Sequence, residues 1–340
     1  MDISQYTFED ICDTYTEDIK NKSISKAQSY GEIIAKPSNC ILSLPFRNAF
    51  EKVYHFEVFP DDTWIVTFPK CGTTWTQEMV WLLKNNLDFE KAKSTDLGDR
   101  VPFFELEKYE EDFRPTSIER SKNLTRPRCI KSHLPVELLP KQLWTVKPKI
   151  VYVTRDPRDV AISYYHHHRL WNGYQGTLED FVDVFLHDRV VYSPYWGHVL
   201  GFLDLPDKSH VLFNTYEEMK KVKDKVHEYF GNKLKFECFQ DLPKVIRKTA
   251  EFLNVDLTSK QVDDLAEHLS FKNMKKNATV NGEDMAAEFK KDNNADMNDE
   301  NLSFIRKGES GGWRKDFGID ILGLVNEEME VYMMFMNIVV

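Results

Sequence analysis

The sequence predicts one α/β domain in which helices flank a central, mainly parallel sheet. Short, nearly all-apolar runs rich in β-branched and aromatic residues alternate with longer segments of helical periodicity. Strands of this character are typical of parallel sheets that are covered on both faces. The chain has 340 residues, 41% of them hydrophobic, which is enough to bury a sizeable core.

The expected strands and helices follow one another in βα order. The expected strands cover residues 63–68, 128–131, 149–154 and 210–213. The helices that follow three of these strands are expected at residues 75–84, 159–168 and 216–230. A strand that turns directly into a helix, repeated along the chain, predicts polar side chains gathered at the carboxyl edge of the sheet.

Two regions are expected to be peripheral to this sheet. Residues 1–50 are polar and mixed in composition, and we expect an N-terminal extension packed on a main domain of residues 51–340. Residues 277–301 are rich in Asp, Glu, Asn and Lys, so we expect a lid loop there.

The charge balance excludes some classes of partner. The chain has 45 Lys and Arg against 55 Asp and Glu, a net charge of −10. This acidity argues against nucleic acid or an anionic membrane as partner, while a few local cations could still hold a small anion. No apolar run is long enough to span a membrane, and the N-terminus resembles neither a signal nor a transit peptide, so we expect a cytoplasmic protein.

We expect no metal site. The five cysteines are scattered without C-x-x-C pairs, which favours reduced thiols over a disulfide framework or a zinc site. The run His166-His167-His168 cannot converge on one ion, because consecutive helical residues point about 100° apart.

The first motif that could carry chemistry is residues 67–75, Thr-Phe-Pro-Lys-Cys-Gly-Thr-Thr-Trp. Here a buried strand turns into a helix, so unpaired backbone N–H groups and the positive end of the helix dipole point at one place. Lys70, Thr73 and Thr74 would add a cation and hydroxyls to this anion cradle. The alternative is an ordinary strand-to-helix turn with a solvated lysine.

The second motif is Arg155, at the end of the strand over residues 149–154, with Ser163 on the following helix. The planar fork of Arg155 would emerge where an α/β sheet binds phosphate. Alternatively, Arg155 and Arg158 could pair with neighbouring aspartates in a surface cluster.

The third motif, residues 306–313, places Arg306 and Lys307 before Gly308 and two further glycines. Glycine lets a backbone approach a ligand closely, and the two cations add charge, although a solvated turn would show the same residues.

The fourth motif is Ile130-Lys131-Ser132-His133-Leu134-Pro135 at the end of a short strand. Lys131 would keep the imidazole of His133 neutral and able to accept a proton, which makes His133 a candidate general base. A lone histidine that merely packs in the core is the alternative.

Taken together and in this order, the four motifs resemble the cytosolic sulfotransferase family over about residues 50–320, as an insect-type member with an extended lid. The resemblance implies that 3′-phosphoadenosine 5′-phosphosulfate (PAPS) is the donor, that 3′-phosphoadenosine 5′-phosphate (PAP) is the product and that no metal takes part. It implies His133 as the base and Lys70 and Lys131 as catalytic cations. The donor residues that it implies are Lys70, Cys71, Gly72, Thr73, Thr74, Trp75, Arg155, Ser163, Tyr216, Leu269, Phe271, Arg306, Lys307 and Gly308. Its acceptor pocket would be lined by Phe103, Phe104, His133, Tyr164, His167 and Trp171.

The sequence departs from the family pattern at several positions. Cys71 replaces Ser or Thr, Leu269 replaces a Thr that often contacts the nucleotide, and Gly312 stands where Asp is common; we expect these to tune affinity without abolishing it. The short dimer motif of the family is degraded within residues 314–323, so monomer and dimer both remain open.

The resemblance implies transfer of a sulfuryl group to a hydroxyl of a small apolar acceptor, such as a phenol, an alcohol, a retinoid or a steroid-like molecule. Two alternatives remain open. One is a retinol-type dehydratase that works through a sulfated intermediate, and the other is a non-catalytic protein that binds a nucleotide or an apolar ligand.

Overall fold

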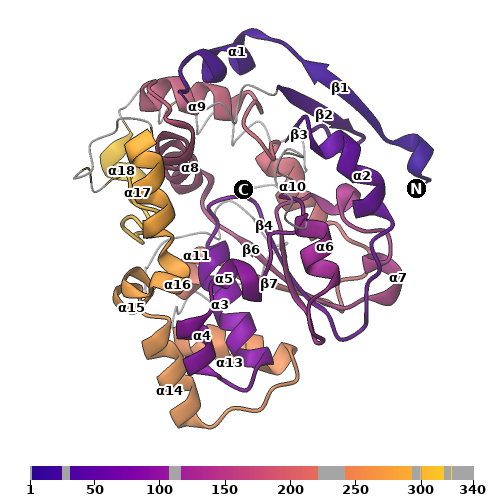
Figure 1. The fold of residues 1–340 in the computed structure, drawn as a ribbon, viewed down its shortest axis with the longest axis vertical. Helices are drawn as coiled ribbons and strands as arrows, with labels where there is room; N and C mark the ends of the chain where they lie inside the picture. The colour runs from indigo at the N-terminus through magenta and orange to yellow at the C-terminus, as the bar shows by residue number, and fades with distance from the viewer. Residues whose placement is uncertain are drawn as a thin grey trace.

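A four-stranded parallel sheet lies at the centre of the part of the chain that the computed structural model describes (Figure 1). The described residues are 2–24, 31–106, 116–220, 242–292, 299, 301–317 and 323. The strand order is β5-β4-β6-β7, and every neighbouring pair is parallel. The strands are β4 (Thr63–Thr67), β5 (Cys129–Ser132), β6 (Lys149–Thr154) and β7 (Val211–Thr215). The predicted α/β class is confirmed, with strand ends that differ by one or two residues.

Helices cover the sheet on both faces. Successive residues of each strand point to opposite sides, so one strand packs against helices on both faces. Trp64 and Val66 of β4 pack in one core cluster with side chains of α2 (Phe46–Tyr54) and α10 (Tyr195–Leu203). Ile65, between them, packs in a second cluster on the other face. That second cluster is formed with α3 (Thr73–Lys84), α13 (Leu242–Phe252) and α14 (Ser259–His268).

A third core cluster lies beyond the carboxyl edge of the sheet. Val160 of α8 (Pro157–Asn172) packs there against Phe181 of α9 (Leu178–Leu186). Phe68, directly after β4, belongs to the same cluster. The long helix α8 is thereby anchored beside the ends of the strands, where the candidate site lies.

The N-terminal segment forms structure that its polar composition did not predict. Strands β1 (Thr7–Ile11), β2 (Glu32–Lys36) and β3 (Cys40–Ser43) make a three-stranded antiparallel sheet, with α1 (Thr14–Asn21) after β1. Alternate residues of β2 and β3 reach the core cluster that contains Trp64. Helix α2 runs across residue 50, where we placed the boundary of the extension.

The segment expected as a lid loop is helical over most of its described part. Helix α16 (Ala278–Asn281) ends at Gly282, and α17 (Glu283–Asp292) then packs along α8 (Figure 1). Ala286 of α17 is buried with Leu170 and Leu302, so an apolar stripe docks this acidic helix. The expectation of a loop was wrong here, because a helix that packs against a single neighbour needs only a few apolar residues on the side in contact.

The remaining helices are short and connect these layers. They are η1 (Ile3–Gln5), α4 (Phe89–Ser94), α5 (Leu97–Arg100), α6 (Ser117–Lys122), η3 (Val136–Leu138), α7 (Leu143–Val146), α11 (Tyr216–Met219), α15 (Phe271–Lys276) and α18 (Trp313–Asp316). Most of the helix expected over residues 216–230, and residues 318–322 of the degraded dimer motif, lie outside the described residues.

A buried ion pair joins the amino ends of two neighbouring strands, β4 and β5. Asp62 precedes β4 and accepts two hydrogen bonds from Arg128, which precedes β5, at 2.8 and 2.6 Å. The two side chains are 0% and 1% exposed. The adjacent Asp61 pairs with Arg126 at the surface, where both side chains are more than 40% exposed.

We predict that Asp62→Ala lowers the free energy of unfolding by about 3–5 kcal/mol, because it leaves a buried guanidinium without its partner. Asp61→Ala is the matched control and should change stability little, since exposed pairs contribute weakly. Denaturant unfolding of both variants measures this difference. Equal losses would contradict a special role for the buried pair.

Candidate active site

The carboxyl ends of the four parallel strands deliver polar side chains to one cavity of about 670 Å³. Lys70 follows β4, Lys131 and His133 come from β5 and its end, Arg155 follows β6, and Tyr216 follows β7. Parallel strands end at the same edge, so residues far apart in sequence converge there. The three motifs that were predicted at strand ends therefore meet in space, and the glycine-rich motif after the expected lid joins them in the same cavity.

The turn between β4 and α3 has the geometry of an anion cradle. Lys70 and Gly72 have φ values of +70° and +96°, so the chain reverses sharply before Thr73 begins the helix. A Cβ on Gly72 would lie 2.8 Å from the Tyr216 ring, so glycine is required sterically as well. Gly72 is the N-cap and has no side chain to bind the first N–H groups of α3, which leaves these groups available to an anion.

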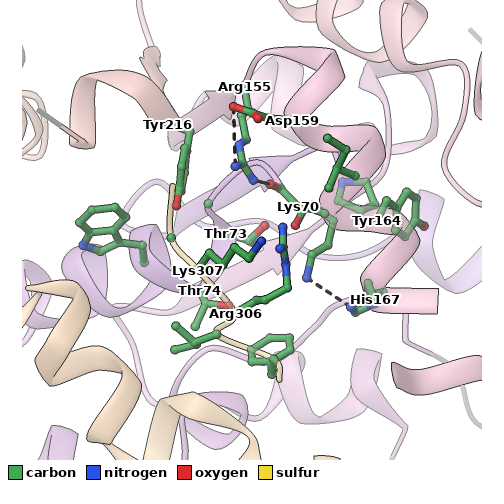
Figure 2. A pocket seen from close by; sticks show the side chains of 18 of the residues that line it. Lys70, Thr73, Thr74, Arg155, Asp159, Tyr164, His167, Tyr216, Arg306 and Lys307 are labelled. Carbon is green, nitrogen blue, oxygen red and sulfur yellow. Dashed lines mark hydrogen bonds and ion pairs between the residues drawn. The ribbon is translucent and has the colours of Figure 1, made fainter. Parts of the chain in front are cut away.

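Arg155 ties two of the loops together across the cavity. Its Nη1 donates to the Lys70 carbonyl at 3.2 Å and its Nη2 to the Glu309 carbonyl at 2.8 Å. The guanidinium lies 4.2 Å from the centre of the Tyr216 ring (Figure 2). Its Nε is buried without a partner in the described part of the chain, so Arg155 has a donor left for a ligand.

Arg158 pairs with a neighbouring aspartate, as the alternative to phosphate binding supposed, but both partners are buried and do not form a surface cluster. Arg158 makes hydrogen bonds with both carboxylate oxygens of Asp156, at 2.9 and 2.6 Å. Arg155 lies 3.9 Å from Asp159, whose oxygens accept the backbone N–H groups of Gly311 at 2.6 Å and Trp313 at 3.2 Å. Asp159 therefore holds the glycine-rich turn in place rather than neutralising Arg155 closely.

The glycine-rich turn closes one side of the cavity. Gly308 has a φ of +59°, and a Cβ there would lie 2.3 Å from the Phe271 ring. The turn carries Arg306 and Lys307, and Figure 2 shows both pointing toward the region between Lys70 and Thr74. Because the backbone at Gly308 lies so close to the Phe271 ring, this side of the cavity is narrow and has a flat aromatic wall.

The cavity concentrates positive charge. Burial lowers the pKa of Lys70 to about 7, with further lowering from Arg155, Lys131 and Arg306. Among the described residues, no carboxylate makes an ion pair with the Lys70 ammonium. A site that lowers the pKa of its own lysine in this way binds an anion favourably, because the negative charge of the anion offsets the repulsion between the cations.

His133 has the protonation state required of a base. Its Nδ1 lies 2.7 Å from the Thr67 carbonyl, which can only accept, so Nδ1 carries the proton and Nε2 has the lone pair. Burial, and then Lys131, lower the pKa of His133 well below its usual value. His198 donates from Nε2 to the His133 carbonyl at 3.0 Å and so fixes the segment from behind.

Glu105 is a site residue that the sequence motifs did not reveal. Its carboxylate accepts the backbone N–H of His133 at 2.6 Å, and burial raises its pKa. The sequence did offer one indication of Glu105, because it directly follows Phe103-Phe104 and so places a carboxylate beside a predicted wall of the pocket. Glu105 holds the backbone of the candidate base, and its negative charge opposes the loss of the proton from Lys131.

The far end of the cavity is apolar. Phe103, Tyr164, His167 and Trp171 line it as expected, and Figure 2 shows Tyr164 and His167 on the side opposite Tyr216. Residues that the sequence did not single out complete the wall: Leu106, Ile162, Tyr192, Met285, Phe289, Phe304 and Ile305. Four of these come from α17 and the segment after it, so the helical lid segment forms part of the pocket.

Two predicted site residues do not face the cavity. Phe104 is fully buried and packs against Phe56 and Trp64 at ring distances of 4.7 and 5.0 Å, so it is a core residue behind Phe103. Cys71 is also fully buried; its backbone N–H donates to the Phe68 carbonyl and its thiol faces the core. Consecutive residues point in different directions, and the motif alone could not tell which of them faced the ligand.

The other predicted site residues line the cavity together. Besides those described above, they are Thr73, Thr74, Trp75, Ser163, Leu269 and Phe271. Within the described ranges, no group of three or more His, Cys, Asp or Glu side chains is arranged to hold a metal ion. None of the helices in these ranges is both long enough and apolar enough to cross a membrane.

The sequence that builds this site matches a known family. The sulfotransferase domain model matches residues 60–334, which is most of the chain. The chain belongs to the sulfotransferase family. It is therefore an enzyme of sulfuryl transfer, and the non-catalytic alternative is set aside.

Relatives and solved structures agree with this family. Luciferin sulfotransferase of Photinus pyralis is 39% identical over 287 residues, 80% of this chain and 71% of that protein. Sulfotransferase 1A1 of Bos taurus is 32% identical over 289 residues, 83% of this chain and 88% of that protein. A crystal structure of retinol dehydratase with androsterone and the inactive cofactor PAP covers 96% of each chain, with a TM-score of 0.78 and 26% identity.

Proposed function

We propose that this sulfotransferase takes PAPS as donor and transfers its sulfuryl group to a hydroxyl of a small apolar acceptor, with His133 as general base. The observation that carries the proposal is the placement of a neutral imidazole and several Lys and Arg side chains around one cavity that is polar at one end and apolar at the other. Transfer forms an acceptor O–S bond and breaks the S–O bond to the 5′-phosphate, whose oxygen keeps the electron pair.

The polar end fits the donor in charge and in shape. Buried guanidinium atoms of two residues that line this end have no hydrogen-bond partner in the described residues: Nε of Arg155 and Nη1 of Arg306. Unsatisfied buried donors carry a free-energy cost that phosphate oxygens would remove. Arg155, Ser163, Arg306 and Lys307 would hold the 3′-phosphate, and the turn at Lys70 would hold the 5′-phosphosulfate.

The adenine would lie against aromatic rings at this end. Trp75 and Phe271 both line the cavity, and the Lys220 ammonium lies 5.1 and 4.7 Å from their ring centres. Both rings are therefore close to the same point in space. A planar base between them would gain stacking energy of the kind that aromatic residues give in nucleotide sites.

His133 and the two lysines would divide the chemistry. Nε2 of His133 would take the proton of the acceptor hydroxyl as the O–S bond forms, and the Thr67 carbonyl would stabilise the imidazolium through Nδ1. Lys70 and Lys131 would stabilise negative charge as the bond to phosphate breaks. The carboxylate of Glu105 accepts the backbone N–H of His133 and so restrains the segment that carries the base.

The apolar end indicates the class of acceptor. Its aromatic and aliphatic walls favour a flat or elongated apolar body, and His133 marks where the reactive hydroxyl would lie. One structural relative is a retinol dehydratase that aligns over nearly the whole chain. This favours one second candidate, a dehydratase in which an allylic sulfate ester formed in the same cavity then eliminates.

Incubation with sulfur-labelled PAPS tests both candidates. We expect label on at least one acceptor in a panel of phenols, sterols and saturated long-chain alcohols, because the cavity is apolar beyond His133. With retinol, a labelled ester indicates simple transfer, whereas free labelled sulfate together with a dehydrated hydrocarbon indicates the dehydratase. If neither ester nor labelled sulfate forms with any of these acceptors, the donor assignment is wrong.

The role of His133 is tested separately. His133→Ala should keep PAP binding, because other residues hold the phosphates, while single turnover falls by about 10² to 10⁴-fold. Equilibrium binding of PAP, the unfolding midpoint and a single-turnover rate are measured on the same variant. A folded, PAP-binding variant with near-normal turnover would show that another group is the base.

A further inference from the structure

We propose that His167 is a positioning residue for Lys70, holding its ammonium by a hydrogen bond to Nδ1 at the junction of the polar and apolar parts of the cavity. The inference rests on the proposed function only where it assigns Lys70 a role in donor binding. It gives His167 a task beyond lining the acceptor pocket.

The first observation is the contact itself. The Lys70 ammonium lies 3.2 Å from Nδ1 of His167, and Figure 2 shows the side chain of Lys70 extended away from Arg155 toward the imidazole. Burial and then Lys70 itself lower the pKa of His167 well below its usual value, so the ring is neutral. An ammonium has only donors, so Nδ1 accepts and Nε2 carries the proton.

The second observation is that the other groups around the Lys70 ammonium offer it little attraction. Phe304 offers a ring face, with its centre 5.1 Å away. The ionisable groups that act on Lys70 from the surrounding elements are mostly cationic: Arg155 after β6, Lys131 on β5 and Arg306 in the glycine-rich turn, besides the buried Cys71 thiol next to it. The neutral imidazoles of His133 and His168 also lie near it.

The flexible side chain of Lys70 needs a hydrogen-bond partner nearby to stay in one position among these cations. Lysine has four rotatable bonds, and repulsion from three cations would move it or neutralise it. Within the described residues, the lone pair of His167 is the hydrogen-bond acceptor that keeps the ammonium charged and in one place. Helix α8 supplies this acceptor rigidly, since the helix is packed against α9 and α17.

The test measures the titration of Lys70 in the free enzyme, by the pH dependence of its acetylation with acetic anhydride, read by mass spectrometry. Only the neutral amine reacts, so the midpoint reports the pKa, which we expect near 7 in the unmodified enzyme. His167→Phe keeps an aromatic ring but loses the acceptor, and should move the midpoint down by about one pH unit.

Conservative and neighbouring variants serve as controls. His167→Asn should restore the midpoint, because its Oδ1 can accept where Nδ1 does. His166→Asn changes the preceding imidazole, which does not line the cavity, and should leave the midpoint unchanged. An unchanged midpoint in His167→Phe, or no rescue in His167→Asn, would overturn the inference, whatever PAP does.

PAP binding then separates this inference from the donor assignment. Affinities of the parent enzyme and His167→Phe should agree near pH 5 and diverge about tenfold by pH 8, because the variant loses the Lys70 charge earlier. In a Lys70→Met background, His167→Phe should have no such effect. A shifted acetylation midpoint without PAP binding at any pH would refute the donor and leave the positioning role intact. If the PAP affinities of the parent enzyme and His167→Phe change with pH in the same way, the proposed link between His167, the charge of Lys70 and PAP binding is refuted.

Discussion

Uncompensated positive charge in one cavity is the constraint on which the rest of this structure depends. The chain as a whole is acidic, with a net charge of −10, yet Lys70, Lys131, Arg155 and Arg306 face a common space. Burial and mutual repulsion lower the pKa of Lys70 to about 7. The fold holds these groups together because four parallel strands end at one edge and each end leads into a packed helix or loop.

Several carboxylates near the cavity hold backbone, and none in the described part of the chain makes an ion pair with Lys70. Asp159 accepts N–H groups of the glycine-rich turn, Glu105 accepts that of His133, and Glu217 accepts that of Asp156 at 2.9 Å. Burial raises the pKa of each of them. These acids fix the loops around the site while the field in the cavity stays positive, which is how an acidic protein can present an anion-binding site.

The sequence predicted the parts of this site that depend on chain direction and local turns. Lys70, Arg155 and His133 follow buried strands, and parallel strands bring their carboxyl ends together whatever the length of the connections. The sequence could not predict which of Phe103 and Phe104 faces the cavity, because that depends on how the segment after α5 pairs with Lys131. Nor did it predict Tyr192 or Phe304, which reach the cavity from connections that have no repeating pattern.

Helix α17 shows a different limit of sequence reasoning. Its composition is that of a solvated loop, and a narrow apolar stripe with Ala286 and Phe289 packs it against α8 and Trp171. Such docking depends on a partner that is distant in sequence. The N-terminal sheet was missed for the same reason, since its buried residues are few and find their contacts on β4 and α2.

The most direct test of the central claim is the stability of Lys70→Met in the absence of ligand, measured by denaturant unfolding across pH. The folded pKa of Lys70, about 7, lies below its ordinary value of 10.5, so the charged lysine destabilises the fold fully below pH 7 and progressively less as pH rises toward 10.5. The account predicts that Lys70→Met is more stable than the parent enzyme at pH 6 and that the difference shrinks by pH 9.5. A variant that is less stable at pH 6 would contradict the claim that the cavity holds uncompensated positive charge.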